Sequence, residues 1–202
     1  KSNSVNAYSM FFPHYKLENP GNGIWQKFRF GDVEFFMLDL RTQRSANANS
    51  INSQGVFDPP AGHSILSGFD IDGENQKSWL ENSLKSSDAK WKVIISPVIF
   101  NPRYMDALHD QKIAQLSPKL QKGIVDKWAG FPEDIEFLKR LITDNSIDNV
   151  IMVSGDSHSS YIDDGENSFI PEISSSNLDT KNSKIGFLIQ LAGYNIWNQG
   201  SY

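Results

Sequence analysis

The stretch that decides the fold reads Asn149-Val150-Ile151-Met152-Val153-Ser154-Gly155-Asp156-Ser157-His158. Its four consecutive apolar residues, two of them valine, predict a strand that is covered on both faces. Gly155 then frees the backbone for a sharp exit. In extended backbone Asp156 and His158, two positions apart, point to the same side. A carboxylate and an imidazole at a strand's carboxyl end are typical of a metal site, and also of a hydrogen-bonded pair without metal.

The composition is that of one globular domain. The chain has 202 residues, of which 39% are hydrophobic and 12% aromatic, enough for one well-buried core. Its net charge is −5 and it has no basic run, which argues against nucleic acid or an anionic membrane as the main partner. The absence of cysteine excludes disulfides, thiolate zinc sites and cysteine catalysis. No apolar run has the length of a membrane span.

The apolar pattern predicts alternating strands and helices. The most convincing helix begins at Pro132, where the proline suits the first turn and two acidic residues follow. Gly31-Asp32 predicts a hairpin turn. We expect residues 1–23 to be irregular, 45–73 to form a long loop, and 101–131 to lack a clear pattern. Strands are predicted at 24–30, 33–40, 91–100, 149–154, 168–173 and 185–191, and helices at 74–84 and from 132 onward. This order predicts an α/β fold with a mixed sheet flanked by helices.

Four charged or aromatic segments follow these elements in a fixed order. They are Leu38-Asp39-Leu40-Arg41-Thr42-Gln43-Arg44, Gln76-Lys77-Ser78-Trp79-Leu80, Asp126-Lys127-Trp128-Ala129-Gly130-Phe131 and Gly155-Asp156-Ser157-His158. Together they resemble the PhoD-like alkaline phosphatases, a branch of the binuclear metallophosphatases. Phe131 stands where that family usually has tyrosine. The resemblance runs from about residue 28 to 159, with weaker similarity to about 178.

The resemblance lacks the amino-terminal half of the family pattern. That half carries a Gly-Asp strand end and an Asp-Asp-His-Glu-like segment, and neither occurs here. The chain also begins at Lys1 and not at methionine. We therefore expect residues 1–202 to be a single domain, the carboxy-terminal half of a metallophosphatase-type αββα sandwich. The missing amino-terminal half of the same protein would be its partner, and this piece alone would be inactive.

The resemblance implies metal-dependent hydrolysis of small phosphate esters, either monoesters or diesters. Two metal ions, calcium with iron, or manganese or zinc, would lie about 3.5–4 Å apart and activate a water. Asp156 and His158 match the family's Gly-Asp-x-His ligands, and Asp126 and Glu172 are further candidate ligands. The resemblance also implies a periplasmic or secreted location.

Three other residues are expected to bind substrate or to shape its cleft. Arg41 and Arg44 suit phosphate, because a guanidinium pairs with it bidentately. The alternative is an ion pair of these arginines with Asp39 that fixes the strand end. Trp128 is expected in the core or in the wall of a substrate cleft.

Two other functions fit parts of the sequence. Gly155-Asp156-Ser157 after a strand also matches the start of GDSL-type esterases, with Ser157 as nucleophile. No histidine follows His158, however, so the triad of such an esterase cannot close. The other alternative is a non-catalytic docking module derived from a metallophosphatase.

Overall fold

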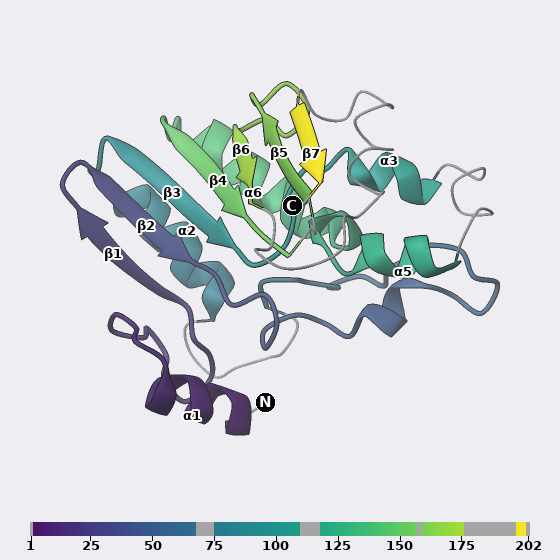
Figure 1. Cartoon of the computed structure of the whole chain (residues 1–202), viewed down its shortest axis with the longest axis horizontal. Helices are drawn as coiled ribbons and strands as arrows, with labels where there is room; N and C mark the ends of the chain where they lie inside the picture. Colours follow the sequence, from purple (N-terminus) through teal and green to yellow (C-terminus); the bar gives the residue numbers. More distant parts are fainter. Residues whose placement is uncertain (1, 68–74, 110–117, 157–158, 176–196, 201–202) are drawn as a thin grey trace.

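A computed structural model describes residues 2–67, 75–109, 118–156, 159–175 and 197–200. The strands of this part are β1 (Gln26–Phe30), β2 (Val33–Met37), β3 (Trp91–Ser96), β4 (Val150–Ser154), β5 (Ser159–Asp163), β6 (Glu172–Ser174) and β7 (Trp197–Gly200). They form one sheet in the order β1-β2-β3-β4-β6-β5-β7 (Figure 1). Strands β2, β3, β4 and β6 run parallel, and the pairs at both edges are antiparallel. The predicted mixed α/β sheet is confirmed.

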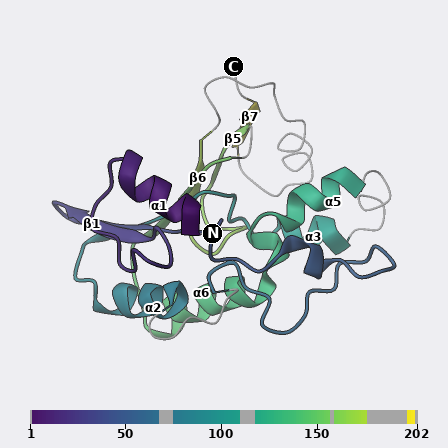
Figure 2. The ribbon, with the colours of Figure 1, turned by 90° about the horizontal axis from the view of Figure 1, so that it is seen from below.

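Helices cover one face of this sheet. The helices of the described part are α1 (Ser2–Phe11), η1 (Asn47–Ser50), α2 (Gln76–Ser86), α3 (Tyr104–His109), α5 (Pro118–Val125), η2 (Trp128–Gly130) and α6 (Pro132–Asp144). Figure 2 shows α2 and α6 together below the sheet and α1 on its other side, near β1. Helices α3 and α5 lie beyond the carboxyl ends of β3 and β4 (Figure 1). None of the described helices has the length and apolarity needed to cross a membrane.

The two covering helices begin where the sequence provides start signals, a capping box for α2 and a proline for α6. The side chain of Asn75 accepts a hydrogen bond from Ser78 N at 3.0 Å, and Ser78 Oγ accepts one from Asn75 N at 3.1 Å. This reciprocal pair is a capping box that starts α2. Helix α6 begins with Pro132, followed by Glu133 and Asp134, whose negative charge suits the helix N-terminus.

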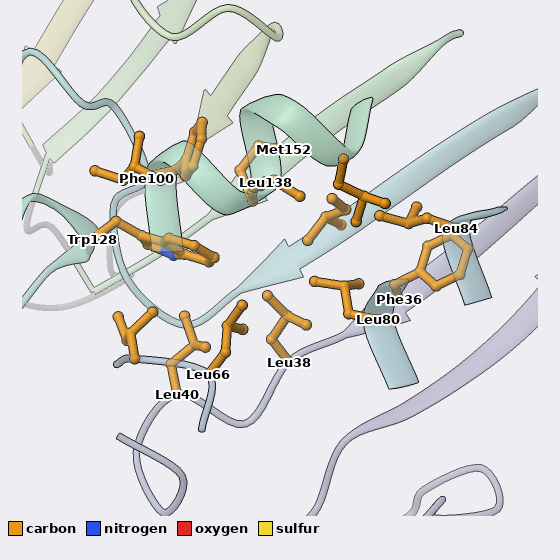
Figure 3. Close-up of a cluster of buried hydrophobic side chains, with 14 of the residues drawn as sticks. Phe36, Leu38, Leu40, Leu66, Leu80, Leu84, Phe100, Trp128, Leu138 and Met152 are labelled. Atoms are coloured by element: carbon orange, nitrogen blue, oxygen red, sulfur yellow. The ribbon is translucent and has the colours of Figure 1, made fainter. Parts of the chain in front are cut away.

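The main core fills the layer between the sheet and helices α2 and α6. Phe36, Ile94 and Met152 lie at paired positions on β2, β3 and β4 and are fully buried. Leu80 of α2 and Leu138 of α6 point into the same layer (Figure 3). Complete burial of one such side chain contributes about 1.5–3 kcal/mol, so this layer holds the strands in register.

The opposite face of the sheet is apolar and remains partly open. Phe35, Val93 and Ile151 alternate with the core residues along β2, β3 and β4, and each is only partly buried. Ile162 and Ile173 are 42% and 47% exposed on the same face. The expectation that the β4 strand is covered on both faces is therefore not met by the described residues, because α2 and α6 cover one face only (Figure 2).

Two stretches predicted to lack regular structure are helical. Residues 2–11 form α1, which is held by the buried Val5 and by a hydrogen bond from Gln26 Nε2 to Tyr8 Oη at 3.2 Å. Residues 101–131 contain α3, α5 and η2. These helices have ten residues or fewer, and helices this short depend on tertiary contacts, which a sequence pattern does not reveal.

The predicted strands near the end of the chain also differ from the structure. The strand expected at 168–173 covers only Glu172–Ser174, because Phe169 adopts a left-handed backbone with φ of 53° and the chain turns there. The strand β5 was not predicted. The strand expected at 185–191 lies outside the described residues.

Candidate functional site

The carboxyl ends of the parallel strands bring the predicted site residues to one edge of the sheet. Ser96 pairs with Ser154 at the ends of β3 and β4, so the segments that leave these strands start side by side. Strand β2 is followed by Arg41 and Arg44, and β4 is followed by Asp156. This edge is where ligands bind in open α/β sheets.

Arg41 joins two carboxylates at this edge. Its Nη1 donates to Asp126 Oδ2 at 2.9 Å, and its Nη2 donates to Asp156 Oδ2. The side chains of Arg41 and Asp156 are 42% and 47% exposed, so this bridge faces solvent. The structure therefore brings together three of the residues that the sequence nominates.

Asp126 is the centre of this charged cluster. Its Oδ1 forms an ion pair with Arg44 Nη1 at 2.8 Å and accepts a hydrogen bond from Asn47 Nδ2 at 2.7 Å. Arg44 also donates to the backbone carbonyl of Asp126 at 3.1 Å. Burial raises the pKa of Asp126, but the hydrogen bond and charge of Arg41 and the charge of Arg44 outweigh it and hold this pKa below 3.8. Asp126 is thus an ionised anchor for the loop that follows β2.

Lys127 adds a further cationic group that the sequence analysis did not identify. Burial lowers the pKa of its ammonium group, and the charges of Arg41 and Arg44 act in the same direction. The nearby carboxylates of Asp156 and Asp126 oppose this shift. The position of Lys127 beside Asp126 was a signal that the sequence did offer. Asn47, which also binds Asp126, was not predicted, because nothing distinguishes it from the other polar residues of the loop at 45–73.

Asp39 does not pair with the arginine guanidinium groups. Its buried carboxylate accepts hydrogen bonds from Ile24 N at 3.1 Å and from Thr42 N at 2.9 Å. Gln76 binds the backbone of Asp39, accepting from its N–H at 2.6 Å and donating to its carbonyl at 3.1 Å. The Leu-Asp-x-Arg and Gln-x-x-Trp-Leu motifs therefore fix the end of β2. The alternative ion pair with Asp39 does not form, because the arginines pair with Asp126 and Asp156.

The turn after β4 is made at Asp156. Asp156 has φ of 61°, in the left-handed region that aspartate adopts more readily than most residues. Gly155 does not take a positive φ, contrary to the expectation that it makes the sharp exit. Because of its positive φ, Asp156 is not in extended backbone. His158 and Ser157 lie outside the described residues.

The described residues do not by themselves fit a binuclear metal site. Hard carboxylate oxygens such as those of Asp156 suit a hard cation. Within residues 2–67, 75–109, 118–156, 159–175 and 197–200, however, no group of three His, Cys, Asp or Glu side chains converges. Both Asp126 oxygens accept from N–H donors instead.

Trp128 lies in the core, two positions after Asp126 in the sequence. It has no exposed surface, its ring packs edge-on against Phe100, and its Nε1 donates to Ser96 Oγ at 3.1 Å. The sequence allowed a place in the core or in a cleft wall, and the structure places it in the core.

His63 is the buried histidine of the described part. It is 3% exposed and stacks on Phe131 with ring centroids 4.6 Å apart. Neither ring nitrogen has a hydrogen-bond partner among the described residues. Burial lowers the pKa of His63, and the charges of Asp134 and Glu133 oppose this shift.

The fold and the cluster define an α/β protein with an arginine–carboxylate site at the carboxyl edge of a mixed sheet. The family model described as PhoD-like phosphatase matches residues 1–186, so the chain belongs to the PhoD-like phosphatase family. Alkaline phosphatase D of Bacillus subtilis (strain 168) is 26% identical over 162 residues, which are 77% of this chain and 25% of that relative.

A solved structure has the same fold. It is described as "Structure of PhoD", matches with a TM-score of 0.66 and 18% identity, and covers 98% of this chain. The match covers 39% of that solved chain, so this chain spans well under half of either relative. The predicted resemblance to the PhoD-like family is confirmed.

Proposed function

We propose that the protein to which this chain belongs hydrolyses phosphate esters. The observation that carries the proposal is the cluster of Arg41, Arg44, Asp126 and Asp156 at the carboxyl edge of the sheet, in a chain of the PhoD-like phosphatase family. Guanidinium groups held in fixed directions recognise the oxygens of a phosphoryl group. The name of the Bacillus subtilis relative, alkaline phosphatase D, supports the same activity.

In this proposal the two arginines have different tasks. Arg44 is 19% exposed and binds both the carboxylate and the backbone of Asp126, so it supports the site. Arg41 is 42% exposed and divides its guanidinium between Asp126 and Asp156. Arg41 can keep its bond to Asp126 while its other nitrogen turns to a phosphate oxygen. Arg41 is therefore the substrate-binding arginine.

We also propose that Asp156 and His158 hold metal in the whole protein, as the family resemblance implies. When bound, two metal ions supply an activated water and Lewis-acid stabilisation of charge. Of the described residues, Asp156 supports this role through its exposed carboxylate and its position at the end of β4. The metal identities remain calcium with iron, or manganese or zinc.

We further propose that the rest of a longer protein packs on the open face of the sheet and completes a second layer. The support is the row of partly exposed apolar side chains on that face, which includes Ile162 and Ile173. An exposed apolar surface of this kind usually marks an interface. In this proposal the 202-residue chain alone has no turnover, because the remaining ligands come from that second layer.

The proposal is tested by kinetics on the full-length protein. We expect hydrolysis of p-nitrophenyl phosphate or bis(p-nitrophenyl) phosphate in the presence of calcium, iron, manganese or zinc. Arg41→Ala removes charge-assisted hydrogen bonds worth about 1.5–3 kcal/mol, so its KM should rise roughly 10- to 100-fold. Arg29→Ala is the matched control, since Arg29 is an equally exposed arginine that pairs with Asp88.

Two outcomes would contradict the proposal. If the full-length protein hydrolyses neither ester with any of these metals, the chain is part of a non-catalytic docking module. If Arg41→Ala changes KM no more than Arg29→Ala does, then Arg41 does not bind the phosphoryl group.

A further inference from the structure

Glu172 is a buried carboxylate that the proposed function does not use. Glu172 begins β6 and has no exposed surface. Its Oε1 accepts from Phe100 N at 2.8 Å and from Ser154 Oγ at 2.6 Å, and its Oε2 accepts from Asn101 N at 2.8 Å. None of the ion pairs in the described part of the chain involves Glu172.

Burying an ionised carboxylate lowers the stability of the fold unless hydrogen bonds compensate for the lost hydration. Burial raises the pKa of Glu172, and the hydrogen bonds from Ser154 and from the two backbone N–H groups oppose that shift. Tyr104 and Tyr161 are buried close by, and their own pKa values are raised first by burial and then by the negative charge of Glu172. The cost of burying Glu172 indicates that its contacts serve a purpose that an apolar residue would not.

Its contacts connect the two segments that carry the site's carboxylates. Ser154 is the last residue of β4 and stands two positions before Asp156. Phe100 belongs to the loop after β3, in which Ile99 accepts a hydrogen bond from Trp128 N at 3.3 Å.

Trp128 is also bound to the end of β3, through Ser96. It stands two positions after Asp126, so this loop supports the segment that holds Asp126. One carboxylate therefore fixes the segment of Asp156 relative to the segment of Asp126.

We propose that Glu172 is a positioning residue for the reaction, and this rests on the proposed function. By holding the end of β4 against the loop after β3, Glu172 sets the separation of Asp126 and Asp156, which Arg41 spans. A negative charge is needed because three N–H and O–H donors point at the same group. Glutamine at this position keeps the shape but presents an NH₂ group to one of those donors.

The test compares two isosteric variants of the full-length protein. Glu172→Gln removes the connecting carboxylate. Asp163→Asn is the matched control, because Asp163 is an equally buried carboxylate on β5. Its hydrogen bonds come from the turn before β6, from Gly165 N, Asn167 Nδ2 and Ser168 Oγ. Turnover of p-nitrophenyl phosphate and hydrogen exchange by mass spectrometry are measured for both variants.

We expect kcat of Glu172→Gln to fall about 10- to 100-fold with KM changed less than threefold, the loss typical of supporting residues in active sites. Hydrogen exchange should rise in the peptides that contain residues 98–101 and 126–130. Asp163→Asn should keep the wild-type kcat and the wild-type exchange in those peptides, even if its melting temperature falls.

If Glu172→Gln does not fold, Ser154→Ala removes a single bond and should lower kcat several-fold, with Ser168→Ala as its control. A wild-type kcat in Glu172→Gln overturns the positioning role and leaves the proposed function unaffected. A wild-type kcat in Ser154→Ala has the same meaning if Glu172→Gln does not fold. An equal loss of kcat in Asp163→Asn also overturns it, because general destabilisation would then explain the effect. A wild-type protein without esterase activity overturns the proposed function and this role together.

Discussion

Replacing Asp126 with asparagine is the most informative single perturbation of the cluster. The substitution preserves the shape of the side chain and removes the charge that Arg41 and Arg44 share. Asp126 is 27% exposed and Arg44 is 19% exposed, so their pair is largely shielded from water and worth about 1–2 kcal/mol. Arg41 is 42% exposed, which limits its pair with Asp126 to under about 1 kcal/mol.

The expected total is about 1–3 kcal/mol of lost stability. At about 2–4 °C per kcal/mol, the value for a domain of this size, that corresponds to a fall in melting temperature of roughly 2–10 °C. Thermal unfolding of the full-length protein, followed by circular dichroism at pH 7, measures this shift. Asp88→Asn is the control, because Asp88 also pairs with an arginine but is 87% exposed, and its melting temperature should equal that of the wild type.

The same variant should weaken substrate binding. Without the Asp126 charge, Arg41 turns fully to Asp156 and is no longer held in a direction that suits phosphate, so KM should rise at least fivefold. A melting temperature within 1 °C of the wild type, together with an unchanged KM, would show that Asp126 does not anchor the arginines. Reduced metal content with an unchanged melting temperature would instead identify Asp126 as a metal ligand.

Three further predictions concern the scaffold. The pKa of His63 is lowered from 6.5, so the folded state gains its full stability from the neutral imidazole above pH 6.5 and loses it as the pH falls through the lowered pKa. Phenylalanine at this position can still stack on Phe131 but does not titrate. The melting temperature of His63→Phe should therefore fall less than that of the wild type between pH 7.5 and pH 5. Leu138→Ala should cost about 2–5 kcal/mol in chemical denaturation, since Leu138 is fully buried between α6 and the sheet. Gln76→Leu should cost about 1–3 kcal/mol in the same assay, because it leaves the buried N–H of Asp39 without its acceptor.

The sequence predicted the central elements because their signals are local. The apolar run at 150–153 and the helix that begins at Pro132 carry their own period and end signals, and both appear in the structure. The short helix α1 carries no such period, and it depends on a contact between Tyr8 and Gln26 that is remote in sequence. Its prediction therefore failed.

The candidate site could be predicted only in part, for the same physical reason. The positions of Arg41 and Asp156 at strand ends follow from the order of strands, which the sequence indicates. The sequence does not predict which residues they pair with. Arg41 and Asp126 are 85 positions apart, and their pairing depends on how the long loop after β2 folds. Glu172 carried even less signal, since a single acidic residue next to Pro171 does not reveal that three donors converge on it.

Our main proposal is that the carboxyl edge of this sheet is part of a metal-dependent phosphoesterase site. Its most direct test measures metal content by elemental mass spectrometry and p-nitrophenyl phosphate hydrolysis on the same samples of full-length wild type and Asp156→Ala. We expect bound metal and turnover in the wild type, and a loss of both in the variant. Equal metal content and equal turnover in the two proteins would contradict it.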